Sequence, residues 1–391
     1  MTADERPPAY RWVVLAAYML TGIVSQLLWI SFAPVDSVAA GVYGVSRDTI
    51  GLLSLVYLLV YVLVSIPVGY VIDASGFRRA ILIGSALLAL SGVARALATG
   101  FALVLAFQAL GAFGQPFILN SISKLVRGWF PEKEAALATG VGTLSILLGL
   151  AFGLGLTPTL VDAVGFSGTL LLYGGISVAA FLLFYALGRE STKPAAAEER
   201  VTASRILEVL KDRNILLLSV LFFLGLGLFN AVATWIEPMV EARGLDLSLA
   251  GPMAGLMILG GIVGAVVIPG LADRYHTLRR PLLASLAVSA VLWSLLGILS
   301  GLVPIAATFL VLGFFFVAAL PLGLELSARS LGGKAVGTAN AVVWEFSQAG
   351  GIVFIVGFQA LASLFGWGSL FFLSSGLVVV GLAVSALLRA R

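Results

Sequence analysis

Polar and aromatic side chains set inside otherwise apolar stretches are the residues of this chain that could do chemistry. Amides can hydrogen-bond a small solute, and an indole face attracts an organic cation by roughly 0.5–2 kcal/mol. A carboxylate in apolar surroundings is costly, so its presence suggests function. These criteria select candidate substrate-binding residues at Trp29, Gln115, Asn120, Asn230, Trp344, Glu345 and Gln348.

Each candidate also has a plainer interpretation. Trp29 could be ordinary packing or an interfacial anchor, and Asn120 could be an amide that joins two helices. Gln115 precedes Pro116, which frees a carbonyl where a helix lines a cavity. Glu345 could attract a cation, carry a coupled proton or pair with a base. Glu237 could likewise attract a cation or carry a coupled proton, or it could mark the external end of a helix.

Nucleophilic and metal chemistry have little support in the composition. Cysteine is absent, and the single histidine, His276, lies in a basic loop beside Arg279 and Arg280. These counts exclude a thiolate nucleophile, a histidine cluster and a disulfide. We therefore expect no enzyme, no metal site and no cofactor.

A second polar group is the charged turn GYVIDASGFRR, which lies between two apolar runs. Gly69 would allow a close helix contact, Gly76 a tight turn, and Asp73 would accept charge-assisted hydrogen bonds at a cytoplasmic gate. Lys124 is a candidate partner for Asp73 or Glu325. The predicted gating residues are Gly69, Asp73, Gly76, Arg78, Arg79, Lys124, Asp273, Arg279 and Glu325.

The elements that carry these residues are membrane-spanning helices. The 391 residues are 60% hydrophobic and only 11% charged, and a bilayer needs about 20 apolar residues per helix. We expect an all-α integral membrane protein, in which Arg95 snorkels to the outer surface. Twelve spans are predicted near 11–36, 49–72, 79–99, 101–125, 134–158, 165–188, 213–240, 249–272, 280–301, 304–328, 335–362 and 367–388.

The chain divides at its longest polar interruption into two similar halves. IPVGYVID is echoed by IPGLAD, and Asp73 and Asp273 lie 200 residues apart. The predicted parts are a six-helix bundle (1–188), a cytoplasmic linker with an amphipathic helix (189–212) and a second six-helix bundle (213–391). Two pseudo-symmetric six-helix bundles are a transporter architecture, with the substrate site near the midplane.

The distribution of basic residues sets the topology. Arginine and lysine gather on the linker face, whereas the opposite face carries only Arg47 and Arg243 among several acids. By the positive-inside rule both termini and the linker are cytoplasmic. The net charge of +4 is no sign of nucleic-acid binding.

The turn Gly69 to Arg79, with its glycines, aspartate and paired arginines, resembles the signature loop of the major facilitator superfamily. Further stretches resemble the feline leukaemia virus subgroup C receptor-related family, whose members carry choline and ethanolamine and have been linked to haem. They are WISFAPVDSVAAGVYGV, LSLVYLLVY, QPFILNSISKLVRGWFPEKE, LPLGLE and GTANAVVWEFSQAGG, which together cover most of the chain.

The resemblance implies where a substrate would bind. In that family the ammonium group sits in an aromatic box whose span 1 tryptophan matches Trp29. Glutamines of spans 4 and 11 match Gln115 and Gln348. The opposite wall is a span 7 tyrosine, where this sequence has Asn230, so the match indicates the place of the site better than its ligand.

These observations predict a transporter that works by rocking-bundle alternating access. No nucleotide-binding motif is present, so transport is facilitated or ion-coupled. Facilitated diffusion of a choline-like amine is favoured. A proton-coupled carrier of a small organic acid or drug-like cation is the alternative. We expect a monomer in a prokaryotic inner membrane whose partners are a small-molecule substrate and the lipid bilayer.

Overall fold

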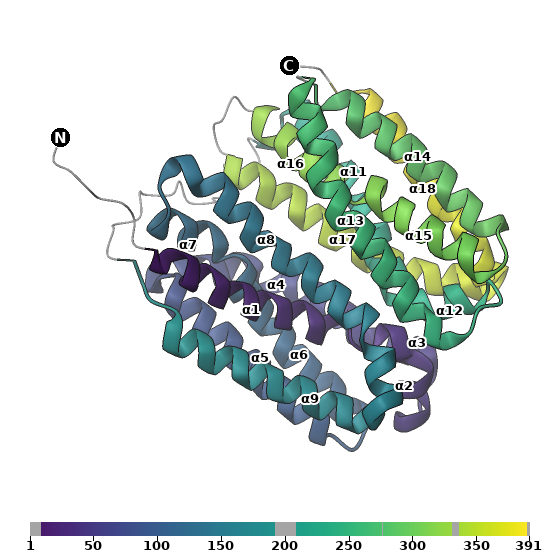
Figure 1. Ribbon diagram of the computed structural model, residues 1–391, viewed down its shortest axis with the longest axis horizontal. Coiled ribbons are helices and arrows are strands. Elements are labelled where there is room, and N and C mark those ends of the chain that lie inside the picture. The colour runs from purple at the N-terminus through teal and green to yellow at the C-terminus, as the bar shows by residue number, and fades with distance from the viewer. Residues whose placement is uncertain (1–8, 192–208, 276, 331–335, 389–391) are drawn as a thin grey trace. The chain divides into compact units, whose positions relative to one another are not determined.

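The computed structural model describes residues 9–191, 209–275, 277–330 and 336–388, and these residues form helices without strands. The chain folds as two compact units. The first comprises Met1–Phe32, Val38–Gly153 and Thr159–Glu198, and the second comprises Ala33–Ser37, Leu154–Pro158 and Glu199–Arg391. Most of the predicted linker, with its amphipathic helix, lies outside the described residues. Figure 1 colours the chain from the N-terminus to the C-terminus.

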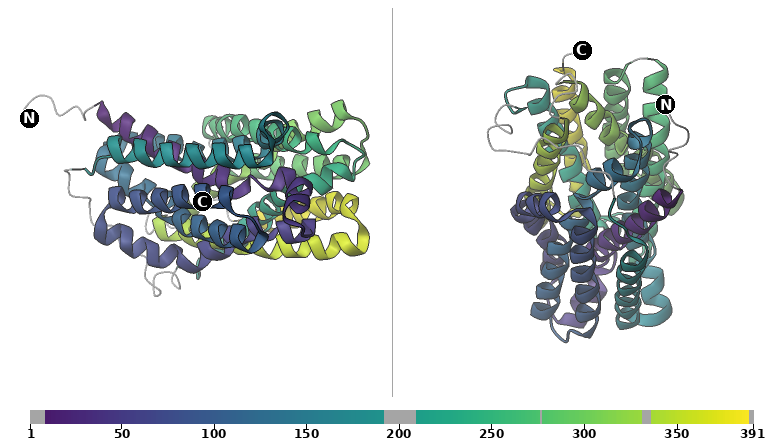
Figure 2. Two further views of the ribbon diagram at one scale, coloured as in Figure 1. Left: turned by 90° about the horizontal axis from the view of Figure 1, so that it is seen from below. Right: turned by 90° about the vertical axis from the view of Figure 1, so that its left-hand side faces the viewer.

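The first unit is built around three helices that contact one another, α1, α5 and α6. Buried apolar side chains such as Tyr18, Phe77 and Phe184 form its core. Both views of Figure 2 show the helices of this unit as long, closely packed rods. The elements are α1 (Tyr10–Ile30), α2 (Asp36–Tyr43), α3 (Arg47–Ile50), α4 (Leu52–Ser75), α5 (Phe77–Leu97), α6 (Phe101–Leu119), α7 (Ile122–Trp129), α8 (Glu132–Gly155) and α9 (Thr157–Leu187).

The second unit pairs its helices as α11 with α17, α13 with α15 and α14 with α18. The α-helices are α11 (Arg213–Thr234), α12 (Ile236–Glu241), α13 (Ala250–Arg274), α14 (Arg279–Ile298), α15 (Leu302–Phe316), α16 (Ala319–Ser330), α17 (Val336–Phe365) and α18 (Leu370–Ala386). The 3-10 turns of this unit are η1 (Ala33–Val35), η2 (Leu247–Leu249) and η3 (Trp367–Ser369).

Twelve helices of the described chain are long and apolar enough to cross a membrane. Each coincides with a span expected from the sequence, so the prediction of an all-α, twelve-span membrane protein is confirmed.

Two boundaries differ from the expectation. The first span was predicted to reach residue 36, but α1 ends at Ile30 and the chain continues through η1 into α2. Pro34 lacks the N–H that the Ile30 carbonyl would need, which disfavours continuation of the helix at this point. The loop expected near residues 159–164 is instead helical, and the chain kinks at Gly165, whose φ of 77° suits glycine.

Small residues form close packing faces between helices. A Cβ added at Gly260 would overlap the carbonyl oxygen of Leu310, and one at Gly264 would overlap that of Phe314. A Cβ at Gly149 would overlap the carbonyl of Ile23. Such contacts hold helices together where no hydrophobic effect acts between them.

Candidate functional site

Trp29 lies in the last turn of α1 and is 6% exposed. Its indole Nε1 donates a hydrogen bond to the Ser54 carbonyl on α4 at 3.0 Å. The indole N–H is therefore already engaged, and the part of Trp29 left for a ligand is its ring.

The two amides predicted on span 4 have different surroundings. Gln115 is buried within α6, one residue before Pro116. Asn120 caps the end of α6, where its Oδ1 accepts from the Tyr61 hydroxyl at 2.7 Å and its Nδ2 donates to Ser65 Oγ at 3.1 Å. Asn120 thus joins α6 to α4, as its plainer interpretation holds, and Gln115 remains the better ligand candidate of the two.

The second unit contributes one residue from α11 and three from α17, and these two helices pack together. Asn230 and Gln348 are buried, at 5% and 8% exposure. Trp344 and Glu345 are half-buried on the same helix as Gln348. Glu345 and Gln348 are three residues apart within α17, so they share a helix face.

Glu237 lies on the short helix α12 and is 1% exposed. Its carboxylate accepts hydrogen bonds from the backbone N–H of Ser37, at 3.2 Å, and from the Ser37 hydroxyl. Ser37 lies in the first turn of α2 and belongs to the same compact unit as Glu237. The carboxylate therefore satisfies the start of a helix, where negative charge is favoured.

The charged turn is tight, as predicted. Gly76 has φ 87°, which permits α4 to end and α5 to begin at once. A Cβ added at Gly69 would meet no atom within 4 Å, and the expected close contact there stays a prediction. The side chains of Asp73 and Asp273 lie outside the described residues.

The basic residues of the turn bind groups within their own unit. Arg78 Nε donates to the Gly188 carbonyl at 2.5 Å and Arg78 Nη2 to that of Tyr185 at 3.3 Å, both at the end of α9. Arg279 likewise donates to the Ala386 carbonyl at the end of α18. Each arginine thus caps the last helix of its unit.

Three further gating candidates lie near the ends of helices. Lys124 donates to the Ile72 carbonyl at 2.7 Å, beside Asp73 in sequence. Arg79 and Glu325 are exposed. The predicted roles of these residues in a gate remain predictions.

Two polar residues of the first unit were overlooked as a pair. Arg95 was expected to snorkel, but it is 0% exposed and bonds to Gln108, which is also fully buried. The expectation failed because an arginine near a helix end looks the same in sequence whether it turns outward or inward. The available signal was the spacing of Gln108 and Gln115, which places both on one face of α6.

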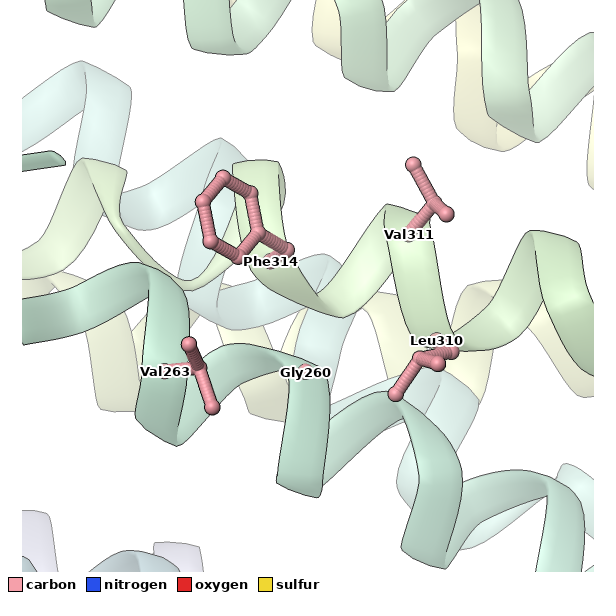
Figure 3. Close-up of a pocket in the computed structure, with 5 residues that line it drawn as sticks. All are labelled: Gly260, Val263, Leu310, Val311 and Phe314. Atoms are coloured by element: carbon pink, nitrogen blue, oxygen red, sulfur yellow. The ribbon is translucent and has the colours of Figure 1, made fainter. Parts of the chain in front are cut away.

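A shallow apolar groove is present on α13 and α15, shown in Figure 3. Gly260, Val263, Leu310, Val311 and Phe314 line it. Its lining contains no polar side chain, and Val263 is 53% exposed. The groove holds none of the predicted binding residues and suits contact with lipid chains.

Comparisons with known proteins agree with this fold. The sequence model of the protein family Major Facilitator Superfamily matches residues 14–355 of this chain. A solved bacterial homologue of the human lysosomal transporter Spinster, inward-facing and unoccupied, superposes with a TM-score of 0.74 at 14% identity, over 97% of this chain and 96% of that one.

Curated relatives cover most of the chain. Solute carrier family 49 member A3 of Xenopus tropicalis is 28% identical over 91% of this chain and 78% of its own length. The choline/ethanolamine transporter flvcr2b of Danio rerio is 26% identical over 99% and 86%. FLVCR1 of Felis catus, also a choline/ethanolamine transporter, is 28% identical over 88% and 67%.

The relatives and the fold are those of transporters, not of enzymes. The chain therefore belongs to the Major Facilitator Superfamily, as a multi-pass membrane transporter related to the feline leukaemia virus subgroup C receptor family.

Proposed function

We propose that this protein carries a choline-like amine across the membrane by facilitated diffusion. The observation that carries the proposal is Trp29, whose ring is buried in the membrane-spanning part while its N–H is bonded to Ser54. An indole with its N–H engaged offers a ligand its π-face, and that face attracts a quaternary ammonium. The names of two relatives, choline/ethanolamine transporters, support the same class of substrate.

The substrate contacts Trp29 and Gln115 and, in the course of alternating access, Asn230 and Gln348. The membrane spans carry few charged residues, which favours a small cation or neutral solute over a polyanion that would need an arginine clamp. Asn230 supplies no second aromatic wall. Affinity for choline is therefore expected to be weaker than in a complete aromatic box.

The transporter works as a monomeric uniporter in a prokaryotic inner membrane, with both termini in the cytoplasm. This orientation rests on the excess of lysine and arginine on the linker face of the sequence. The gate on that face includes Asp73 and Lys124, because Lys124 bonds to the carbonyl next to Asp73.

A proton-coupled carrier is the second candidate, and one observation favours it. Glu345 is a half-buried carboxylate inside the span 341–365, where carboxylates are rare and often carry protons. Uptake driven by a pH gradient and lost in Glu345→Gln would support this candidate. Choline uptake that ignores the gradient would exclude it.

The direct test is a binding titration on purified protein with choline and its uncharged isostere 3,3-dimethylbutanol. A cation held by the indole face gains up to about 2 kcal/mol, which is a factor of about thirty in affinity. Wild type should prefer choline, Trp29→Ala should lose that preference, and Asn230→Tyr should strengthen it. If Trp29→Ala binds both ligands as wild type does, the proposal is wrong.

A further inference from the structure

The end of α1 is held by two buried side chains from neighbouring helices. Arg95 Nη1, on α5, donates to the Leu28 carbonyl at 2.7 Å and to Gln108 Oε1 at 3.0 Å. Gln108 Nε2, on α6, shares its hydrogens among the carbonyls of Leu28 at 3.2 Å, Trp29 at 3.3 Å and Leu53 at 3.3 Å. We call these two side chains the Arg95–Gln108 pair.

The Arg95–Gln108 pair donates hydrogen bonds to backbone carbonyls at the end of α1. The last carbonyls of a helix have no partner within it, and they carry the negative end of the helix dipole. Water cannot satisfy them inside a bilayer, so other side chains must. A cation that donates to these carbonyls supplies both the hydrogen bonds and the favourable charge.

The guanidinium of Arg95 is fully buried, and its Nη1 carries the hydrogen bonds given above. Within the described chain its Nε and Nη2 are buried without a hydrogen-bond partner. The ring of Phe32 lies 5.2 Å from its guanidinium carbon. The negative end of α1 and this ring offset part of the cost of burying the charge.

Gln108 ties together the two segments that fix the Trp29 side chain. It bonds the backbone of Trp29 on one side and the Leu53 carbonyl of α4 on the other. The next residue of α4, Ser54, accepts the Trp29 indole N–H. Gln108 thus holds the backbone of Trp29 directly, and it holds the segment of α4 that accepts the hydrogen bond from the Trp29 ring.

We propose that Arg95 and Gln108 are positioning residues, which hold the Trp29 indole in the orientation that receives the ammonium group of the substrate. This inference rests on the proposed function only where it concerns the substrate. That the pair orients Trp29 can be tested without any ligand.

Gln108→Glu separates the two roles of Gln108, which accepts a hydrogen bond from Arg95 and donates to the carbonyls. The carboxylate still accepts from Arg95, so the variant keeps a charged partner for the arginine, but it has no hydrogens to give to Leu28, Trp29 or Leu53. Gln108→Met removes donor and acceptor together at similar volume. Gln359→Met, at a half-buried glutamine of α17 in the other unit, is the control.

The orientation of Trp29 is read by fluorine NMR on protein labelled with 5-fluorotryptophan. The chain has 7 tryptophans, and loss of one signal in Trp29→Phe assigns Trp29. We expect the Trp29 signal to shift or broaden in Gln108→Glu and Gln108→Met, with the other signals and those of Gln359→Met unchanged. Arg95→Lys, which keeps the charge but loses the planar fork, should give a smaller shift.

The effect on the substrate is read by choline titration in a double-mutant cycle. Gln108→Glu should weaken choline binding by about threefold to thirtyfold, since a residue that acts through Trp29 cannot cost more than Trp29 itself. In the Trp29→Ala background the same change should have no further effect. A merely structural role would weaken binding equally in both backgrounds.

The outcomes separate the two proposals. An unmoved Trp29 signal in both Gln108 variants overturns the positioning role, whatever choline does. A moved signal with unchanged choline affinity in Trp29→Ala leaves the orientation of Trp29 established and refutes the choline site. Tighter choline binding in Gln108→Glu, without a moved signal, would mean that charge near α1 and not orientation governs affinity, and would also overturn the proposal.

Discussion

The two six-helix units hold the end of their first helix in different ways. In the first unit the Trp29 carbonyl accepts from Gln108 of another helix. In the second unit the carbonyl of Asn230, which stands 201 residues later, accepts from Thr234 of its own helix at 2.8 Å. Both ends thus have a local side-chain donor, since Ser31 Oγ donates to the Leu28 carbonyl at 3.3 Å. The first unit adds the tertiary donors Arg95 and Gln108.

Both units also have close glycine contact with their first helix: Gly149 of α8 meets α1 in the first unit, and α17 meets α11 in the second. A Cβ added at Gly350 of α17 would overlap the Phe223 carbonyl of α11, and one added at Gly227 of α11 would overlap the backbone of Gly350. The Trp235 indole, which follows α11, donates to the Ile355 carbonyl of α17 at 2.9 Å. The end of α11 is thus held by glycine contact and one indole bond, whereas the end of α1 has the Arg95–Gln108 pair besides its glycine contact.

The difference teaches how a repeated fold becomes asymmetric. A side-chain pair can fix one aromatic ring in place, whereas glycine contact fixes helix spacing and leaves no polar group behind. At corresponding positions the first unit thus has the aromatic ring of Trp29, and the second unit has the amide of Asn230. Four changes would break or sharpen this comparison.

The largest expected effect is on the glycine contact. Gly350→Ala should destabilise the protein by about 3 kcal/mol, at the upper end for overpacking, because the obstruction is backbone and cannot rotate away. The measurement is the melting temperature in detergent. Gly357→Ala, on the same helix with no atom within 4 Å of the added Cβ, should be nearly neutral. Equal melting temperatures for the two variants would contradict the account of α11 and α17.

The second effect concerns the polar pair. Arg95→Leu should destabilise the protein by about 2 kcal/mol, since buried carbonyls at the end of α1 lose a charged donor. Arg79→Leu, at an exposed position of the same helix, serves as the control. A variant Arg95→Leu as stable as the control would show that the end of α1 needs no donor from α5.

The third change compares the two copies of the charged turn. Asp73→Asn should slow uptake into proteoliposomes about tenfold, which is about 1.4 kcal/mol in the barrier. It should leave choline affinity unchanged, because Asp73 lies in the last turn of α4, at the predicted gate. Trp29 contacts the opposite end of that helix, at Ser54. Asp273→Asn tests whether the second copy matters as much. A tenfold loss of affinity at normal turnover would place Asp73 in the binding site.

The smallest effect should be the same in both units. Arg78→Ala and Arg279→Ala each remove a cation from the end of the last helix of a unit, worth about 0.5 kcal/mol for a partly exposed group. Nearly equal, small drops in melting temperature are expected. A large drop for only one of them would show that the repeat has diverged at this cap as well.

The sequence predicted most of the fold, because a run of about 20 apolar residues has the length and composition of a membrane-spanning helix. The charged turn and its second copy indicated the family. The turn at Gly76 followed from the residue type alone. These features are local or periodic, so they can be read along the chain.

The tertiary structure decided what the polar residues bind. Arg95 and Gln108 are 13 residues apart and on different helices, so no local pattern tells that they meet beneath Trp29. Asn120 was a candidate ligand from sequence, and only packing showed it bonded to Tyr61 and Ser65. Composition sets which groups must find partners inside a membrane, and the arrangement of the helices decides which partners they find.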